Sequence, residues 1–580
     1  MGRQPAQLVV RNANLVNVHT CEIQPGTDIA VSEGRIALVG DAGHTIGPET
    51  TVVDAGGMYL VPGFLDGHIH VESSMVSVTE FARSVLPCGT TAIFMDPHEI
   101  ANVLGLEGVR LMHEEGRIVP LRVFTTVPSC VPAAPGMEDA GAAIGPADVR
   151  EALSWDGVVG LGEMMNYPGV ITGDPSTHAI IKETLKAGKV VTGHFAMAAG
   201  GKELAAYRAA GCTSCHESVT KEDALAKLRS GMYTMLREGS AWHDIKATIR
   251  AITEEGIDST YAILCSDDTH PETILQRGHL NHVIGRAIQE GMNPIRAVQM
   301  ATINTARYFR CDHELGSIAP GKYADFSLLS DLAEVKVEKV FIAGQQVAAG
   351  GKLLVPLPKK TYPAFARQSV RLKRRLTEDD FAVPVPKTDS PVTVRVIEIK
   401  EAQVVTQEKL CKMIPHNGYL LQDTERDMAK IAVFERHKGT GSYAVGFVTG
   451  FGFTSGAVAS TVAHDSHNLL VVGTNDQDMA FAGNVLADCG GGMVAVADGK
   501  VLALVELPLA GLMSYQPVEA VAKAVAGLAD VWKTLGCTLV SPFMTMALLS
   551  LPVIPALRLT NRGLVDVNSF SFVDLIVDAD

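Results

Sequence analysis

The sequence lacks long hydrophobic runs and is poor in basic residues. No uninterrupted apolar segment approaches the roughly 20 residues that a membrane-spanning helix needs. The 49 lysines and arginines are outnumbered by 64 aspartates and glutamates, which leaves a formal net charge of −15. A protein that binds nucleic acid electrostatically needs clustered basic side chains to displace counterions from phosphates. We therefore expect neither a membrane span nor a nucleic-acid partner, and a small-molecule substrate is the better hypothesis.

The chain also lacks a recognisable export signal and a disulfide framework. Its first residues include no apolar stretch of signal-peptide length, so we expect a cytoplasmic location. The ten cysteines are scattered and require no oxidising compartment. Cys212-Thr-Ser-Cys215-His216 matches the pattern of covalent haem attachment or, without the histidine, of a redox pair. Because haem attachment needs export, we interpret these residues as buried cysteines beside a functional histidine.

The pattern of apolar residues predicts an α/β fold. From about residue 61, apolar β-branched runs alternate with amphipathic stretches, as in successive βα units. Eight strand candidates lie at 63–72, 90–96, 117–127, 158–165, 189–196, 212–217, 232–240 and 261–268. Eight such strands suggest a closed (β/α)8 TIM-type barrel. One of the intervening helices is expected to start with Ser176 as its N-cap and to end at Gly188.

Three further regions are expected around this barrel, which is assigned to residues 61–305. Residues 1–60 and 306–355 are predicted to form a discontinuous small β-sandwich domain, because both stretches show short alternating strands. The proline content of residues 356–391 favours an extended linker. Residues 392–580 are predicted to form an additional C-terminal α+β domain. A homo-oligomer, a dimer or larger, is also expected, since symmetric assemblies are common among soluble proteins.

Two histidines on the first predicted barrel strand give the first chemical signal. His68 and His70 are two residues apart in Phe64-Leu-Asp-Gly-His-Ile-His, so the alternation of a strand points both imidazoles to one side. Imidazole is mostly neutral near pH 7 and offers a ring nitrogen to zinc, iron, manganese or cobalt. A single pair of this kind is not specific for metal.

Four more side chains of ligand type fall at or near the carboxyl ends of later predicted strands. They are Glu163, His194, His216 and Asp267. These strand ends converge on one face of a (β/α)8 barrel, so residues far apart in sequence can share one coordination sphere. Each residue alone would also fit a buried hydrogen-bonded polar group. Branched apolar side chains normally fill a barrel interior, so the set of six predicts a metal site.

Longer motifs resemble a known family. The run from Val53 to His70 is similar to the entry to the first barrel strand in the amidohydrolase superfamily. More narrowly, the chain resembles adenine deaminases in Met95-Asp-Pro-His-Glu-Ile-Ala-Asn102, Gly162-Glu-Met-Met-Asn-Tyr-Pro-Gly169, Thr192-Gly-His194, Cys265-Ser-Asp-Asp-Thr269 and Ala463-His-Asp-Ser-His-Asn468. The resemblance covers most of the chain.

The resemblance implies a binuclear centre with two divalent metal ions, manganese or iron(II) by preference and zinc as an alternative. His68, His70 and Asp267 would bind one ion. His194 and His216 would bind the other, and Glu163 would lie between the two ions or shuttle a proton. Many relatives have a carboxylated lysine where this sequence has Glu163, which argues against a dihydroorotase or a hydantoinase.

The reaction implied is the hydrolytic deamination of adenine to hypoxanthine and ammonia, as in purine salvage or catabolism. A metal-bound hydroxide would attack C6, because coordination lowers the pKa of water. Asp267 is the candidate base, and Glu163 is the candidate proton donor to N1. His98 is a candidate for hydrogen-bonding the purine or binding a further ion, and Arg237 is a candidate for substrate binding. A loop-ordering histidine and a structural ion pair fit them as well.

Other functions stay open at this point. The same site would serve an amidohydrolase that acts on another aminopurine or on a cyclic amide. A metal-dependent scaffold that has lost catalysis is disfavoured, because all six ligand types are present. In the C-terminal part, His464, Asp465, Ser466 and His467 could form a second catalytic cluster or shape a turn that covers the barrel mouth.

Overall fold

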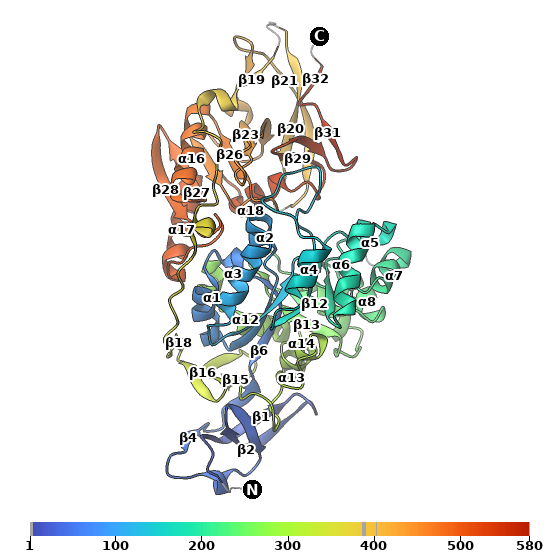
Figure 1. Cartoon of the computed structure of the whole chain (residues 1–580), viewed down its shortest axis with the longest axis vertical. Helices are drawn as coiled ribbons and strands as arrows, with labels where there is room; N and C mark the ends of the chain where they lie inside the picture. Colours follow the sequence, from blue (N-terminus) through green and yellow to red (C-terminus); the bar gives the residue numbers. More distant parts are fainter. Residues whose placement is uncertain (1–3, 199, 386–389, 402, 579–580) are drawn as a thin grey trace.

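The computed structural model describes residues 4–198, 200–385, 390–401 and 403–578. Three regions follow one another along the long axis of the molecule (Figure 1). A β-rich region holds the N-terminus, a barrel surrounded by helices occupies the centre, and a region with a second large sheet holds the C-terminus. Among the described residues, no helix combines the length and the apolar character of a membrane-crossing segment.

The central region is an α/β domain of the predicted TIM type. Its parallel strands are β6 Phe64–His70, β7 Thr90–Met95, β8 Arg122–Val127, β9 Val158–Met164, β10 Val190–Gly193, β11 Ser214–Cys215, β12 Tyr233–Arg237 and β13 Ala262–Cys265. Hydrogen bonds join β6 to β10 in order and β11 to β13 in order. A parallel bridge between Val191 and Cys212 links these two groups. Directly after β13, β14 (Asp267–Asp268) pairs with β6, so the ring of strands closes.

Helices between and after these strands form the outer layer (Figure 1). They are α1 Val78–Val85, α2 His98–Leu104, α3 Leu106–Gly116, α4 Pro146–Ala152, α5 Tyr167–Thr172, α6 Pro175–Lys186, α7 Gly201–Ala209, α8 Lys221–Arg229, α9 Ile245–Thr248, α10 Arg250–Thr253, α11 Pro271–Arg277, α12 Leu280–Gln289, α13 Pro294–Met300 and α14 Ile303–Tyr308. The predicted N-cap of α6, Ser176, is wrong. Asp174 caps this helix, because its carboxylate accepts a hydrogen bond from the Thr177 amide and Pro175 suits the first helical position.

Strands from both sides of the barrel segment meet in one nine-stranded sheet. Its members are β1 Leu8–Asn17, β2 Glu22–Ser32, β3 Arg35–Val39, β4 Thr51–Asp54, β5 Tyr59–Pro62, β15 Phe326–Asp331, β16 Lys336–Ile342, β17 Gln345–Ala349 and β18 Lys352–Leu353. The two halves join where β15 pairs antiparallel with β5. The closer description of this region as a small sandwich stays a prediction.

The C-terminal region contains a second nine-stranded sheet with helices packed on it. Its strands are β20 Val392–Ile399, β21 Thr406–Met413, β23 Met428–Phe434, β24 Tyr443–Thr449, β25 Ala457–Ser460, β26 Leu469–Gly473, β27 Gly492–Ala497, β28 Lys500–Glu506 and β32 Ile576–Asp578. Helix α16 (Asp476–Cys489) packs on β25, β26 and β27, and α17 (Val518–Thr534) packs on β28. A shorter helix, α18 (Pro542–Ala547), lies between this sheet and the barrel.

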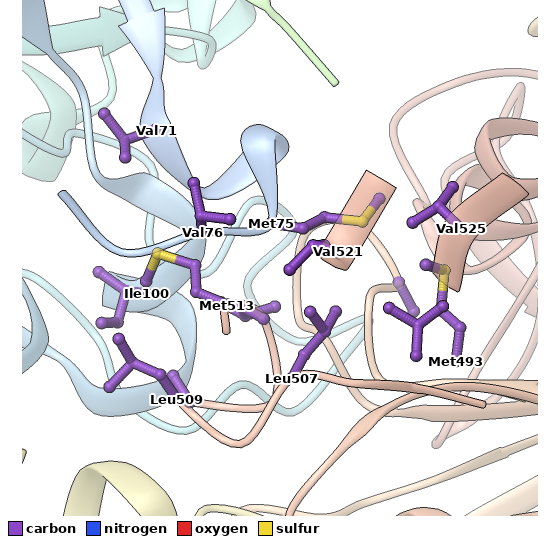
Figure 2. Close-up of a cluster of buried hydrophobic side chains, with 14 of the residues drawn as sticks. Val71, Met75, Val76, Ile100, Met493, Leu507, Leu509, Met513, Val521 and Val525 are labelled. Atoms are coloured by element: carbon purple, nitrogen blue, oxygen red, sulfur yellow. The ribbon is translucent and has the colours of Figure 1, made fainter. Parts of the chain in front are cut away.

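A shared apolar core fixes the C-terminal region over the carboxyl end of the barrel. Val71, Met75, Val76 and Ile100 from the barrel pack with C-terminal side chains (Figure 2). The C-terminal members labelled there are Met493, Leu507, Leu509, Met513, Val521 and Val525. Backbone hydrogen bonds reinforce this contact, since Ser77 N donates to Ser514 O at 2.9 Å and Ser514 N donates to Met75 O at 2.8 Å. The segment after His70 is therefore covered by the C-terminal region.

Truncation of this core should destabilise the whole chain. Met513 is fully buried, and Met513→Ala should lower the free energy of unfolding by about 2–5 kcal/mol through lost burial and a residual cavity. Urea denaturation of the full chain, followed by tryptophan fluorescence, measures this loss. Leu502→Ala is the control, because Leu502 on β28 is 45% exposed. Equal losses in the two variants would contradict the role given to this core.

Candidate metal centre

The two histidines of β6 converge as their alternation predicts. Nε2 of His68 and Nε2 of His70 lie 3.1 Å apart, and both residues are buried. Nδ1 of His70 lies 2.8 Å from the backbone oxygen of Asp96. This contact favours the tautomer in which Nδ1 donates to the carbonyl, which leaves the lone pair of Nε2 free for a ligand.

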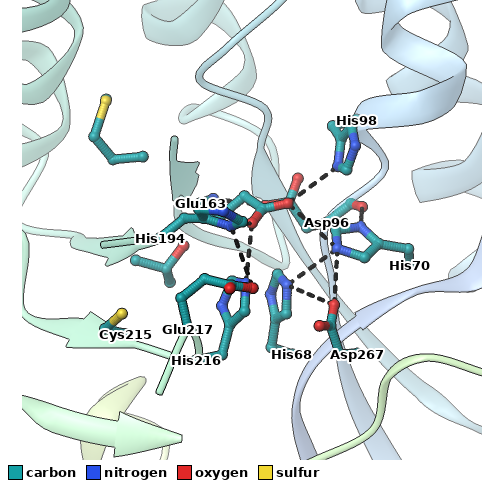
Figure 3. A network of polar contacts seen from close by, with 12 residues as sticks. His68, His70, Asp96, His98, Glu163, His194, Cys215, His216, Glu217 and Asp267 are labelled. Atoms are coloured by element: carbon teal, nitrogen blue, oxygen red, sulfur yellow. Dashed lines mark hydrogen bonds and ion pairs between the residues drawn. The ribbon is translucent and has the colours of Figure 1, made fainter. Parts of the chain in front are cut away.

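Glu163, at the carboxyl end of β9, lies among four imidazoles (Figure 3). Its Oε1 is 3.3 Å from His70 Nε2 and 3.3 Å from His98 Nδ1. Its Oε2 is 2.6 Å from His194 Nδ1 and 3.1 Å from His216 Nε2. The two oxygens therefore face different groups of histidines, which is the geometry that a carboxylate bridging two cations requires.

Asp267 lies beside the two histidines of β6. Its Oδ1 lies 3.3 Å from His70 Nε2 and 3.6 Å from His68 Nε2. The residue has a φ of 58°, a left-handed conformation that costs free energy for a residue other than glycine and that occurs often at functional sites. Arg237 Nη1 donates to Asp267 Oδ2 at 2.9 Å, which orients the carboxylate.

For His68, Glu163 and Asp267, the electrostatics favour the protonation state that binds metal. Burial lowers the pKa of His68 well below its usual value, and His216 and His70 lower this pKa further, so the imidazole is neutral. Burial would raise the pKa of Glu163, but His194 and His216 outweigh it and hold the pKa well below its usual range. Burial would also raise the pKa of Asp267, but His70, His216 and Arg237 outweigh burial and hold this pKa well below its usual range. Both carboxylates are therefore ionised.

The donor atoms form overlapping groups of the size of a coordination shell. In three groups the ligand atoms all lie within 4.8 Å of one another: His68, His70 and Glu163; His68, His216 and Asp267; and Glu163, His194 and His216. Mixed imidazole and carboxylate donors suit manganese, iron and zinc. The residues thus fit divalent metal ions, and the structure brings together all six residues that the sequence indicated.

The two candidates for substrate binding have different surroundings. Arg237 is buried in ion pairs, because its guanidinium contacts Glu217, Asp267 and, at 2.7 Å, Asp244. These pairs occupy the guanidinium and orient Asp267. His98 is buried beside the centre, with its Nδ1 facing Glu163 and its ring centroid 4.5 Å from that of His70.

Two acidic residues of the site were missed by the sequence analysis. Asp96 Oδ2 accepts a hydrogen bond of 2.7 Å from the backbone amide of Glu163, so it fixes the end of β9. Glu217 lies 3.7 Å from His216 Nε2 and pairs with Arg237. Asp96 stands in the Asp-Pro-His-Glu motif after β7, and this position is a signal that could have identified it. Glu217 follows His216 and has no comparable signal.

A buried lysine donates hydrogen bonds to the backbone next to His194 and His216. Lys227 Nζ donates to the backbone oxygens of Phe195 and Glu217 at 3.1 and 3.0 Å. Cys212 and Cys215 are free and buried, as expected, and burial raises the pKa of the Cys212 thiol to about 12. The segments that carry His194 and His216 are therefore fixed by packing and hydrogen bonds.

Comparisons with known proteins give matches to both the barrel and the C-terminal region. Residues 59–347 match the amidohydrolase family, and residues 403–571 match the adenine deaminase C-terminal domain. The adenine deaminase of Moorella thermoacetica is 62% identical over 99% of this chain and 96% of its own length. That of Clostridium botulinum is 56% identical over 100% of this chain and 96% of its own length. Among solved structures, molinate hydrolase overlaps 62% of this chain and 99% of its own at 17% identity and a TM-score of 0.46, a similarity too loose to bear on function.

Loss of the buried guanidinium should strongly destabilise the protein. Arg237→Met would leave Asp267, Glu217 and Asp244 without their cation, and a broken buried ion pair costs about 3–5 kcal/mol. Thermal and chemical denaturation of the metal-free protein measure this cost. Arg229→Met removes a largely exposed guanidinium and serves as the control. A similar small effect in both variants would refute the role of Arg237 in orienting these carboxylates.

Metal binding to the metal-free protein should release protons. Burial lowers the pKa of His194, but Glu217 and Glu163 outweigh burial and raise it to about 9. The imidazole is therefore protonated at pH 7, and a metal ion must displace this proton. Addition of Mn²⁺ at constant pH should show net proton release at pH 7 and less at pH 10, with an apparent affinity that rises from pH 7 toward pH 9. Equal release at both pH values would contradict the assignment of His194 as a ligand.

Proposed function

The chain belongs to the adenine deaminase family of the amidohydrolases, and we propose that its barrel site hydrolyses adenine to hypoxanthine and ammonia. One observation supports this most strongly. A single carboxylate, Glu163, faces two pairs of imidazoles at the carboxyl end of the barrel, where enzymes of this fold have their active sites.

The proposed centre holds two divalent metal ions. His68, His70 and Asp267 would hold the first, His194 and His216 would hold the second, and Glu163 would lie between the two ions or shuttle a proton. Such ions, when bound, lower the pKa of water and supply a nucleophile at neutral pH. The family resemblance favours manganese or iron(II), with zinc as the alternative, and imidazole and carboxylate donors are compatible with all three.

Two carboxylates move the two protons of the attacking water. As the alternative to lying between the ions, Glu163 would take one proton from the water and deliver it to N1 of the purine. Asp267 accepts the other proton and passes it to the 6-amino group, which leaves as ammonia while the C6 carbonyl forms. Asp267 is already ionised, as a group that accepts a proton must be. Both protons of water are accounted for in hypoxanthine and ammonia.

The remaining assignments stay predictions. His98 is close enough to Glu163 to contact a purine at N1, whereas Arg237 acts through Asp267. Another aminopurine or a cyclic amide is the alternative substrate class. The domain boundaries, a cytoplasmic location and a homo-oligomeric state belong to the same proposal.

Replacement of the Asp267 carboxylate by an amide tests the proposed general base directly. In the manganese-loaded protein, Asp267→Asn should lower kcat for adenine about 10²–10⁴-fold, the usual contribution of a general base. Ammonia release and the ultraviolet change to hypoxanthine are followed together, and metal content is measured in each preparation. Asp530→Asn, on the exposed side of α17, is the control and should retain full activity.

Absence of adenine turnover in the metal-loaded wild-type protein would overturn the substrate assignment. The next substrates would then be other aminopurines and cyclic amides. Full activity of Asp267→Asn at unchanged metal content would leave the substrate assignment standing. It would contradict the role of Asp267 as the general base.

A further inference from the structure

A second cluster of imidazoles and carboxylates lies beside the centre, where the C-terminal region covers the barrel. His98 and Glu99 begin helix α2, and His464 and Asp465 come from the C-terminal region. Ligand atoms of His98, His464 and Asp465 all lie within 4.8 Å of one another, and those of His70, His98 and Glu99 do so as well. We propose that His98, Glu99, His464 and Asp465 bind a third divalent metal ion.

Buried carboxylate oxygens at this place have no hydrogen-bond partner. Among the described residues, both oxygens of Glu99, Oδ2 of Asp465 and Oε2 of Glu72 are in this state. Glu99 is 2% exposed, and Asp465 and Glu72 are each 4% exposed. A buried carboxylate without a partner is strongly unfavourable, so these oxygens require a partner that the side chains nearby do not supply. A cation coordinated among them would be that partner.

Glu99 and Asp465 have no lysine or arginine partner in the described part of the chain. Glu72, Glu99, Glu138 and Asp465 are all buried here. In the described part of the chain, the ion pairs of Glu99 and Asp465 are with histidines alone, at 3.7 Å, and Glu72 and Glu138 form none. A divalent cation would therefore supply Glu99 and Asp465 with a closer partner than the histidines at 3.7 Å.

The two nitrogens of His98 have different environments. Nδ1 faces Glu163 Oε1 at 3.3 Å, and Nε2 faces Glu99 Oε1 at 3.7 Å. Histidines that bind metal commonly have a carboxylate or carbonyl at one nitrogen and the ion at the other. In this arrangement, His98 connects the third ion to Glu163. Two imidazoles and two carboxylates suit manganese, iron or zinc better than magnesium or calcium, which prefer oxygen donors alone.

Free space borders two of the four proposed ligands, Glu99 and His464. This cavity of about 60 Å³ is lined by residues that include Glu72, Glu99 and His464, and it is large enough to hold water. An ion there could complete its coordination with water. Two of its protein ligands come from the barrel and two from the C-terminal region, so binding would join the two regions beside the active site.

Metal content measured on the full chain tests the proposal. The metal-free protein is loaded with Mn²⁺, passed through a desalting column, and analysed by plasma mass spectrometry. Wild-type protein should retain three ions per chain, and Asp465→Asn and His464→Gln should each retain two. His270→Gln is the matched control and should retain three, because His270 lines the same cavity but is not among the cluster's grouped ligands.

The two remaining ions in each variant report that the barrel is intact, so a loss of one ion is not unfolding. Two ions in the wild-type protein, or three in both variants, would overturn the proposal. Unchanged metal content with a raised KM for adenine would also overturn it and would assign the cluster to the purine. Because the ions are counted without substrate, this result does not depend on whether adenine is the substrate.

Discussion

The structure of the site depends on one buried carboxylate, Glu163, held among four imidazoles. A carboxylate at this depth is unfavourable alone, and only the surrounding positive or metal-binding groups make its ionised form stable. Asp96 fixes its backbone, and Lys227 fixes the segments that carry His194 and His216. The closed ring of strands brings the site residues of β6, β9, β10 and β14 together at one end of the barrel. The barrel therefore places imidazole and carboxylate donors around Glu163.

A second constraint is the cover formed by the C-terminal region. The apolar core shared by the segment after His70 and the segment around Met513 places His464 and Asp465 next to His98 (Figure 2). A polar centre covered in this way is shielded from water, which strengthens every electrostatic interaction inside it. The C-terminal region therefore contributes to the environment of the site as well as to the stability of the chain.

The barrel and its six principal donors were predictable because both leave local patterns: apolar runs at regular intervals, with histidines and acids at their ends. The residues that contact those donors were harder to predict from the sequence. Glu217 and Asp244 act through Arg237, and the sequence does not show which of many acids meets a given guanidinium. The contact of Asp465 with His98 joins residues far apart in the chain and depends on domain packing. The cap of α6 was misassigned because Asp174 and Ser176 are both suitable, and backbone geometry decides between them.

The central claim is that Glu163 joins two metal ions, and anomalous diffraction from manganese-loaded crystals tests it most directly. Beside Glu163, the account predicts two strong peaks about 3.5–4 Å apart, the spacing usual for binuclear hydrolytic sites, in addition to the third ion proposed between His98 and Asp465. One peak should lie toward His68, His70 and Asp267 and the other toward His194 and His216, with one oxygen of Glu163 on each. A single peak, or a Glu163 side chain turned away from both ions, would contradict the account.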